Sequence, residues 1–170
     1  APDGGLYVPQ AVPRLPENWA QAASFPDLAA NVIGQWLEGA MDPDVVETAV
    51  REALNFAVPV VPLSGAWEGV HVLELFHGPT LSFKDFGART MSRLMAASLP
   101  KGEDVTVMVA TSGDTGSAVA DGFSGIPGVR VVLLYPDGQV SPTQERQLIV
   151  QREGVVALRV DGTFDDCQRM

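Results

Sequence analysis

Lys84 is the residue of this sequence best suited to covalent chemistry. It lies between two aromatic residues, Phe83 and Phe86, in the stretch LELFHGPTLSFKDFGAR, and Asp85 follows it directly. An amine in an apolar environment loses the solvation that favours its ammonium form, so free amine becomes available to attack a carbonyl and form a Schiff base. A lysine whose charge points into solvent is the alternative interpretation, because lysines are almost never fully buried unless paired.

A second segment whose residues could bind a ligand is the polar loop from Thr111 to Thr115, within TSGDTGS. It lies between an apolar run and a helix-like run, the position where open parallel sheets bind ligands. Gly113 and Gly116 allow the backbone to approach a ligand, and hydroxyls with free N–H groups at a helix N-terminus suit a carboxylate or phosphate. A loop that only caps its helix is the alternative, since Ser, Thr and Asp are preferred caps.

The residues before position 100 are predicted to be mostly helical, because their apolar side chains recur at spacings of three and four. The predicted helices cover 25–37 and 43–56, and a third begins at Lys84 with Ser82 as its cap. Alternation predicts a short strand over 70–76, and the prolines within 58–62 predict a connector.

After position 100 the pattern changes to apolar strands that alternate with helices. The predicted strands cover 104–110, 129–135 and 155–160. Strands buried on both faces and separated by helices indicate right-handed parallel βαβ units, the start of a doubly wound α/β sheet. We therefore expect a lysine-bearing N-terminal region at 1–100 and an incomplete parallel-sheet domain at 101–170. The chain stops within a helix predicted near Phe164, so we expect a fragment of a longer protein.

Composition excludes several classes of function. The 21 acidic residues outnumber the 11 basic ones, for a formal charge of −10, and this disfavours a nucleic-acid partner. Cys167 is the single cysteine, so neither an intrachain disulfide nor a cysteine-based metal site is expected, and a reducing cytoplasmic location is favoured. No apolar run approaches the roughly 20 residues of a membrane helix, so no membrane association is expected.

Two of these motifs resemble a known enzyme family. FHGPTLSFKDFGAR closely resembles the pyridoxal-phosphate lysine motif of threonine synthases, and TSGDTG resembles the substrate-binding loop of fold-type II pyridoxal-phosphate enzymes. Asp114 stands where the cysteine-synthase relatives have asparagine, which favours the threonine synthase branch. Further similar stretches extend the resemblance over the whole chain: APDGGLYVP, LLYPDGQVSPTQERQL and DGTFDDCQ.

The resemblance implies a tryptophan synthase β-like fold, pyridoxal 5'-phosphate as cofactor and a small-molecule substrate, O-phospho-L-homoserine. The reaction it implies is the conversion of this substrate and water to L-threonine and phosphate, the last step of threonine biosynthesis. Lys84 would hold the cofactor and transfer protons, with Phe83 and Asp114 also at the cofactor. The implied substrate-binding residues are Thr111, Ser112, Gly113, Asp114 and Thr115.

Other aspects of the site stay open at this stage. Arg89 and Lys101 are candidates for the substrate phosphate, and His77 is a secondary candidate because it adjoins the lysine motif. The family's glycine-rich loop for the cofactor phosphate has no match in residues 1–170, and nothing indicates an oligomeric state.

A related phospholyase or a serine/threonine dehydratase is the nearest alternative function. A non-catalytic α/β ligand-binding domain is the alternative from another class, which the absence of GxxxxGK and GxGxxG motifs weakens.

Overall fold

The computed structural model describes residues 1–170, and they form two compact units, Ala1–Arg51 and Glu52–Met170. This division differs from the boundary expected after residue 100. The reason is that the helix bearing Lys84 packs against the helix that follows the first parallel strand, so both belong to the second unit. The regions 1–100 and 101–170 stay a prediction for the domains of a longer protein.

The first unit holds helix α1 and most of helix α2, and both helices start where the sequence signals predict. Helix α1 covers Phe25–Trp36, and its N-cap is Ser24, whose hydroxyl accepts from the backbone N–H of Asp27 at 3.3 Å. Helix α2 covers Pro43–Ala53, so it ends earlier than the predicted 56. Proline in the first turn is compatible with each helix because no N–H is needed there.

A small antiparallel hairpin begins the second unit. Strand β1 covers Val60–Pro62 and pairs with β2, His71–Leu73. The predicted connector at 58–62 was therefore wrong, and the strand predicted over 70–76 is shorter. The prolines of this segment are typical of a connector. Proline is, however, compatible with a β-strand when it lies at the end of the strand or in an edge strand of the sheet.

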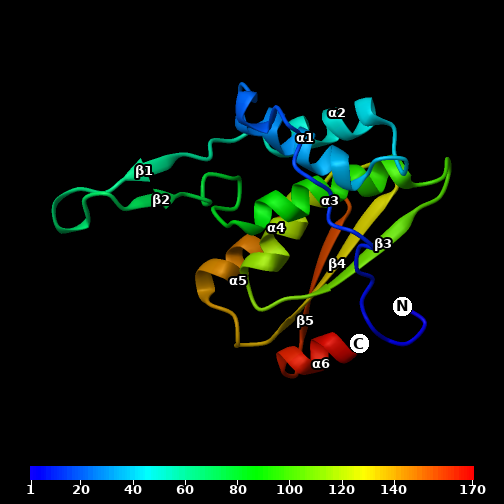
Figure 1. The fold of residues 1–170 in the computed structure, drawn as a ribbon. Helices are drawn as coiled ribbons and strands as arrows, with labels where there is room; N and C mark the ends of the chain where they lie inside the picture. Colours follow the sequence, from blue (N-terminus) through cyan, green and yellow to red (C-terminus); the bar gives the residue numbers. More distant parts are fainter. The chain divides into compact units, whose positions relative to one another are not determined.

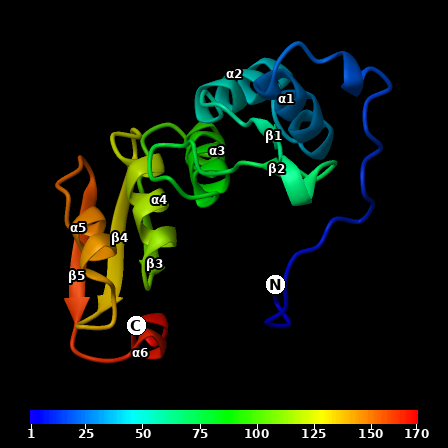
Figure 2. The same cartoon turned by 90° about the vertical axis from the view of Figure 1, so that its left-hand side faces the viewer.

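A parallel sheet forms the centre of the second unit, as predicted (Figure 1). Its strands lie in the order β3, β4, β5, and they cover Val105–Ala110, Val129–Pro136 and Val155–Val160. The helices that follow them are α4 at Asp114–Phe123, α5 at Pro142–Leu148 and α6 at Phe164–Arg169. Figure 2 shows β4 and β5 ending at the same edge of the sheet, with α6 beyond it. The βαβ prediction is confirmed.

The core of this unit lies where α4 packs on β4, and Phe123, Val131 and Leu133 are its largest fully buried apolar side chains together with Leu148. The prediction of strands buried on both faces is correct for β4 and wrong for β3 and β5. Met108 on β3 is 59% exposed, because α6 covers only part of the sheet surface on which it lies. None of the helices is both long enough and apolar enough to cross a membrane.

Candidate active site

Lys84 is the first residue of helix α3, Lys84–Ser98, as the sequence predicted. Ser82 is buried and its hydroxyl accepts from the Lys84 backbone N–H at 3.3 Å. The N-cap position itself belongs to Phe83, so Ser82, the predicted cap, supports the helix start from the residue before the N-cap. The Lys84 amine lies 4.2 Å from the centre of the Phe83 ring, a cation–π distance. The side chain is thus half-buried against an aromatic face.

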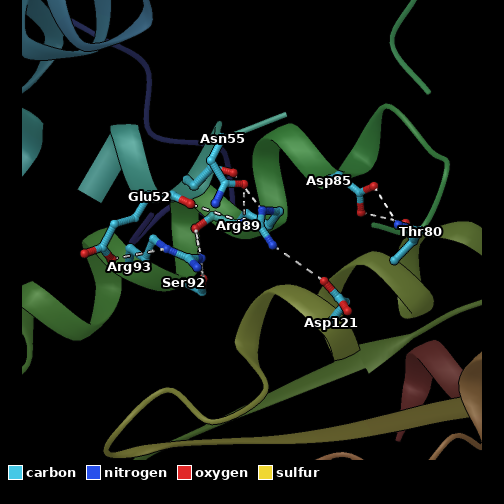
Figure 3. A network of polar contacts seen from close by, with 9 residues as sticks. Glu52, Asn55, Thr80, Asp85, Arg89, Ser92, Arg93 and Asp121 are labelled. Carbon is cyan, nitrogen blue, oxygen red and sulfur yellow. Dashed lines mark hydrogen bonds and ion pairs between the residues drawn. The ribbon is translucent and has the colours of Figure 1, made fainter. Parts of the chain in front are cut away.

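Asp85, the next residue, is completely buried. Its carboxylate accepts two hydrogen bonds from Thr80, one from the backbone N–H at 2.9 Å and one from the hydroxyl at 2.6 Å (Figure 3). Gly78 lies against the same carboxylate, since a Cβ there would be 2.4 Å from Asp85 Oδ2. The turn before α3 is therefore built around a buried acid.

The second loop is organised by Thr111, whose side chain is buried. Its hydroxyl oxygen accepts from the backbone N–H groups of Gly116 at 2.9 Å and Gly113 at 3.1 Å, and the hydroxyl donates to the Gly113 carbonyl at 3.2 Å. The Thr111 side chain thus shapes the loop from inside. Ser112 and Thr115, by contrast, are exposed and free to meet a ligand.

Helix α4 begins within this loop, at Asp114, after the N-cap residue Gly113. The Thr111 hydroxyl accepts from the N–H of Gly116, the third residue of α4, and so caps this helix start from within the loop. The capping interpretation of the loop therefore holds for Thr111, whereas Ser112 and Thr115 stay exposed. Asp114 is exposed, and its carboxylate accepts from the Gln144 side-chain amide of α5 at 2.9 Å. The N–H groups of Asp114 and Thr115, which Thr111 leaves unpaired at this helix start, are suited to bind an anion.

Helices α3 and α4 lie side by side and run in the same direction (Figures 1 and 3). They approach closely at Gly122, where a Cβ would be 3.0 Å from the carbonyl carbon of Ala88. Both helix starts therefore lie at one end of the pair, the end where β3 finishes. The fold brings Lys84 and the loop from Thr111 to Thr115 to this same end, although Thr111 lies 27 positions after Lys84 in the sequence.

Arg89, a sequence candidate for the substrate phosphate, is occupied by protein groups (Figure 3). Its guanidinium donates to the Ala53 carbonyl at 2.7 Å, to the Asn55 side chain at 3.0 Å and to the Glu52 carbonyl at 3.2 Å. It also lies 3.7 Å from Asp121 of α4. Arg89 thus links residues 52–55 to α4, a contact that sequence reasoning missed because no local pattern signals it.

The other sequence candidates have simpler surroundings. Lys101 is exposed in the turn after α3. His77 pairs with the Glu74 carboxylate at 2.6 Å. Arg93, one turn after Arg89, is a cation that the sequence did not single out: burial, and then the charge of Arg89, lower the pKa of its guanidinium.

Comparison with known proteins places these features in a family. Residues 56–170 match the model of the family described as pyridoxal-phosphate dependent enzyme, and residues 1–54 match the model described as threonine synthase N terminus. The chain is 36% identical to a threonine synthase of Haemophilus influenzae over 99% of its own length. It is 40% identical to a threonine synthase of Schizosaccharomyces pombe, again over 99% of its length.

Solved structures of threonine synthases are similar in fold to this chain. The crystal structure of threonine synthase from Escherichia coli is similar with a TM-score of 0.84 and 36% identity, over 99% of this chain and 39% of that one. A threonine synthase from Brucella melitensis with bound pyridoxal phosphate gives a TM-score of 0.86 at 38% identity, over 98% of this chain and 38% of that one. The similarity confirms the predicted fold-type II architecture.

The chain spans 39% of the Haemophilus influenzae relative and 36% of the Schizosaccharomyces pombe one. Within that span, the family match covers the lysine helix, the TSGDT loop and all three parallel strands. The match encloses a half-buried lysine at the start of α3 and the polar loop at the start of α4. The chain belongs to the family of pyridoxal-phosphate dependent enzymes.

Proposed function

We propose that this chain is the lysine-bearing part of an enzyme that converts O-phospho-L-homoserine and water to L-threonine and phosphate. The proposal is supported by the names of its relatives and by the match of residues 1–54 to the threonine synthase N terminus. The observation that carries it is the placement of the two helix starts, Lys84 in α3 and the TSGDT loop at α4, at the same end of the α3–α4 pair.

Lys84 has the central role in this proposal. Its amine binds pyridoxal 5'-phosphate covalently and, when released from it, accepts and returns protons at the substrate carbons. When bound, the cofactor withdraws electrons from those carbons and so makes them acidic. Phe83 adjoins the amine and keeps one side of it apolar. These residue types fit the cofactor, because covalent binding needs an amine that is not fully solvated.

The loop before α4 is the proposed site for the substrate carboxylate. The donors are the N–H groups of Asp114 and Thr115 at the start of α4, together with the exposed hydroxyls of Ser112 and Thr115. Gly113 contributes to the proposed site through its backbone, since the Gln144 side chain fills the space that a Cβ would take, and the buried Thr111 hydroxyl holds the loop in shape. Asp114 is proposed to lie at the cofactor, oriented by its hydrogen bond from Gln144.

The substrate is thus proposed to be a small molecule, and we keep the cytoplasm as the proposed location. The one cysteine, Cys167, is buried and unpaired, which suits a reducing compartment. Groups for the substrate phosphate are not assigned, since Arg89 is already engaged by protein atoms.

The proposal is tested on the full-length protein by supplying pyridoxal 5'-phosphate, reducing with borohydride and mapping the modified peptide. We expect a pyridoxyl group on Lys84, no label in Lys84→Ala, and unchanged labelling in Lys101→Ala as the matched control. Product analysis with O-phospho-L-homoserine then separates the possible reactions. Equal amounts of threonine and phosphate support the proposal, whereas phosphate with a keto acid would identify a lyase or dehydratase instead.

A further inference from the structure

Asp85 is a buried acid that the proposed reaction does not use. It is 0% exposed, and none of the ion pairs in the structure includes it. Burying a carboxylate without compensation is costly, so its neighbours must satisfy it. The two Thr80 hydrogen bonds do so, helped by the positive end of the α3 dipole, because Asp85 is the second residue of that helix.

The turn that encloses this acid has little freedom. A side chain at Gly78 would overlap the Asp85 carboxylate, with the nearest oxygen 2.4 Å from a Cβ. Leu81 has a positive φ of 59°, which is unfavourable for a bulky residue and persists only where surrounding contacts impose it. The Leu81 backbone N–H donates to the Gly78 carbonyl at 3.1 Å and closes the turn. The contacts between Thr80 and Asp85 therefore fix residues 78–85 as one unit.

We infer that Asp85 is a positioning residue for the Lys84 amine. Lys84 lies within the segment whose ends, Thr80 and Asp85, are joined by two hydrogen bonds, so its backbone has one position and its side chain starts from a fixed point. A covalent bond to a carbonyl forms readily only when the amine is already aligned. The inference rests on the proposed function, in which Lys84 binds pyridoxal 5'-phosphate.

Variants of Asp85 and Thr80 test the two hydrogen bonds between these residues. Asp85→Asn keeps the shape of the side chain but turns an amide toward one of the Thr80 donors. Thr80→Val removes only the hydroxyl donor and keeps the backbone N–H, whereas Thr80→Ser keeps both. Asp104→Asn is the matched control, because Asp104 is 60% exposed and pairs with Arg130 on the surface.

The readouts are the dissociation constant for pyridoxal 5'-phosphate, the rate of borohydride labelling at Lys84, and the pH midpoint of the visible absorption band, all on full-length protein. For Asp85→Asn we expect binding weakened by about 10- to 100-fold and a shifted midpoint, since small misplacements of a reacting group have effects of this size. The dissociation constant and pH midpoint of Thr80→Val should lie between those of Asp85→Asn and those of the wild-type protein. Thr80→Ser and Asp104→Asn should match wild type.

A role in folding alone predicts a different result. Urea unfolding would then show lower stability, while the folded Asp85→Asn protein would keep the wild-type dissociation constant and pH midpoint, and this result overturns the inference. If Asp85→Asn does not fold, Thr80→Val decides the question by the same measurements. Absence of label on wild-type Lys84 would instead refute the proposed function, so the two failures are distinguishable.

Discussion

Gly122 of α4 faces the backbone of Ala88 in α3, and a Cβ on Gly122 would lie 3.0 Å from the Ala88 carbonyl carbon and 3.0 Å from the Arg89 nitrogen. This contact sets the spacing between the helix that starts with Lys84 and the helix that follows the TSGDT loop. Because the neighbouring atoms belong to the backbone, they cannot rotate away as a side chain would.

Gly122→Ala is therefore expected to destabilise the protein by about 1–3 kcal/mol, the usual cost of overpacking a well-packed contact. Urea unfolding measures this change. Gly87→Ala is the matched control, since Gly87 lies in α3 with no atom within 4 Å of a Cβ. That change should stabilise the helix by up to about 1 kcal/mol. Equal stability of the two variants would contradict the proposed role of the Gly122 contact.

Arg89→Ala is expected to lower the free energy of unfolding by about 2–3 kcal/mol, because it removes charged hydrogen bonds and leaves the Ala53 carbonyl without its donor. Arg130→Ala serves as the comparison. Arg130 is 68% exposed and pairs only with Asp104, so its loss should cost about 0–1 kcal/mol. Chemical denaturation of both variants checks the prediction, and similar values for the two would show that the Arg89 contacts contribute little.

Thr111→Val keeps the shape of the side chain and removes the hydroxyl that accepts from Gly113 and Gly116. Two backbone N–H groups then lose their partner, at a cost of about 1–3 kcal/mol. Because these groups shape the proposed carboxylate site, KM for O-phospho-L-homoserine should also rise. Thr111→Ser retains the hydroxyl and should lie close to wild type in both measurements. A wild-type KM for Thr111→Val would show that the Thr111 hydroxyl does not contribute to substrate binding.

The lowered pKa of Asp166 predicts that the stability of helix α6 depends on pH. Hydrogen bonds from the Thr163 hydroxyl and backbone N–H, together with the adjacent Arg169, lower its pKa from 3.8 to about 2. A lowered pKa in the folded state stabilises α6 at pH values above about 4, and this contribution is lost as the pH falls from about 4 toward 2.

An NMR titration of the Asp166 carboxyl carbon measures this pKa directly. In Thr163→Val, which lacks the hydroxyl donor, the pKa should rise toward its ordinary value. In Thr106→Val, a substitution at an exposed position of β3, the Asp166 pKa should stay unchanged. An ordinary Asp166 pKa in the wild-type protein would show that the capping contacts do not persist in solution.

The amino-acid sequence determined the parts of this protein that depend on neighbours along the chain. The apolar runs that became β3, β4 and β5 marked a parallel sheet, since buried strands alternate with helices in such folds. Lys84 was placed at a helix start, and the loop from Thr111 to Thr115 at a strand end, by their local patterns alone. These signals are short-range, so they can be read without knowing the fold.

The tertiary structure decided what depends on residues far apart in the sequence. Strand β1 was misread because its pairing with β2 outweighs the prolines that mark a connector. Arg89 was a candidate ligand for phosphate until its contacts with residues 52–55 and Asp121 were visible. The close approach of Gly122 to Ala88 has no local signature either. Packing joins such residues through space, and that is why periodicity and spacing along one chain do not encode these contacts.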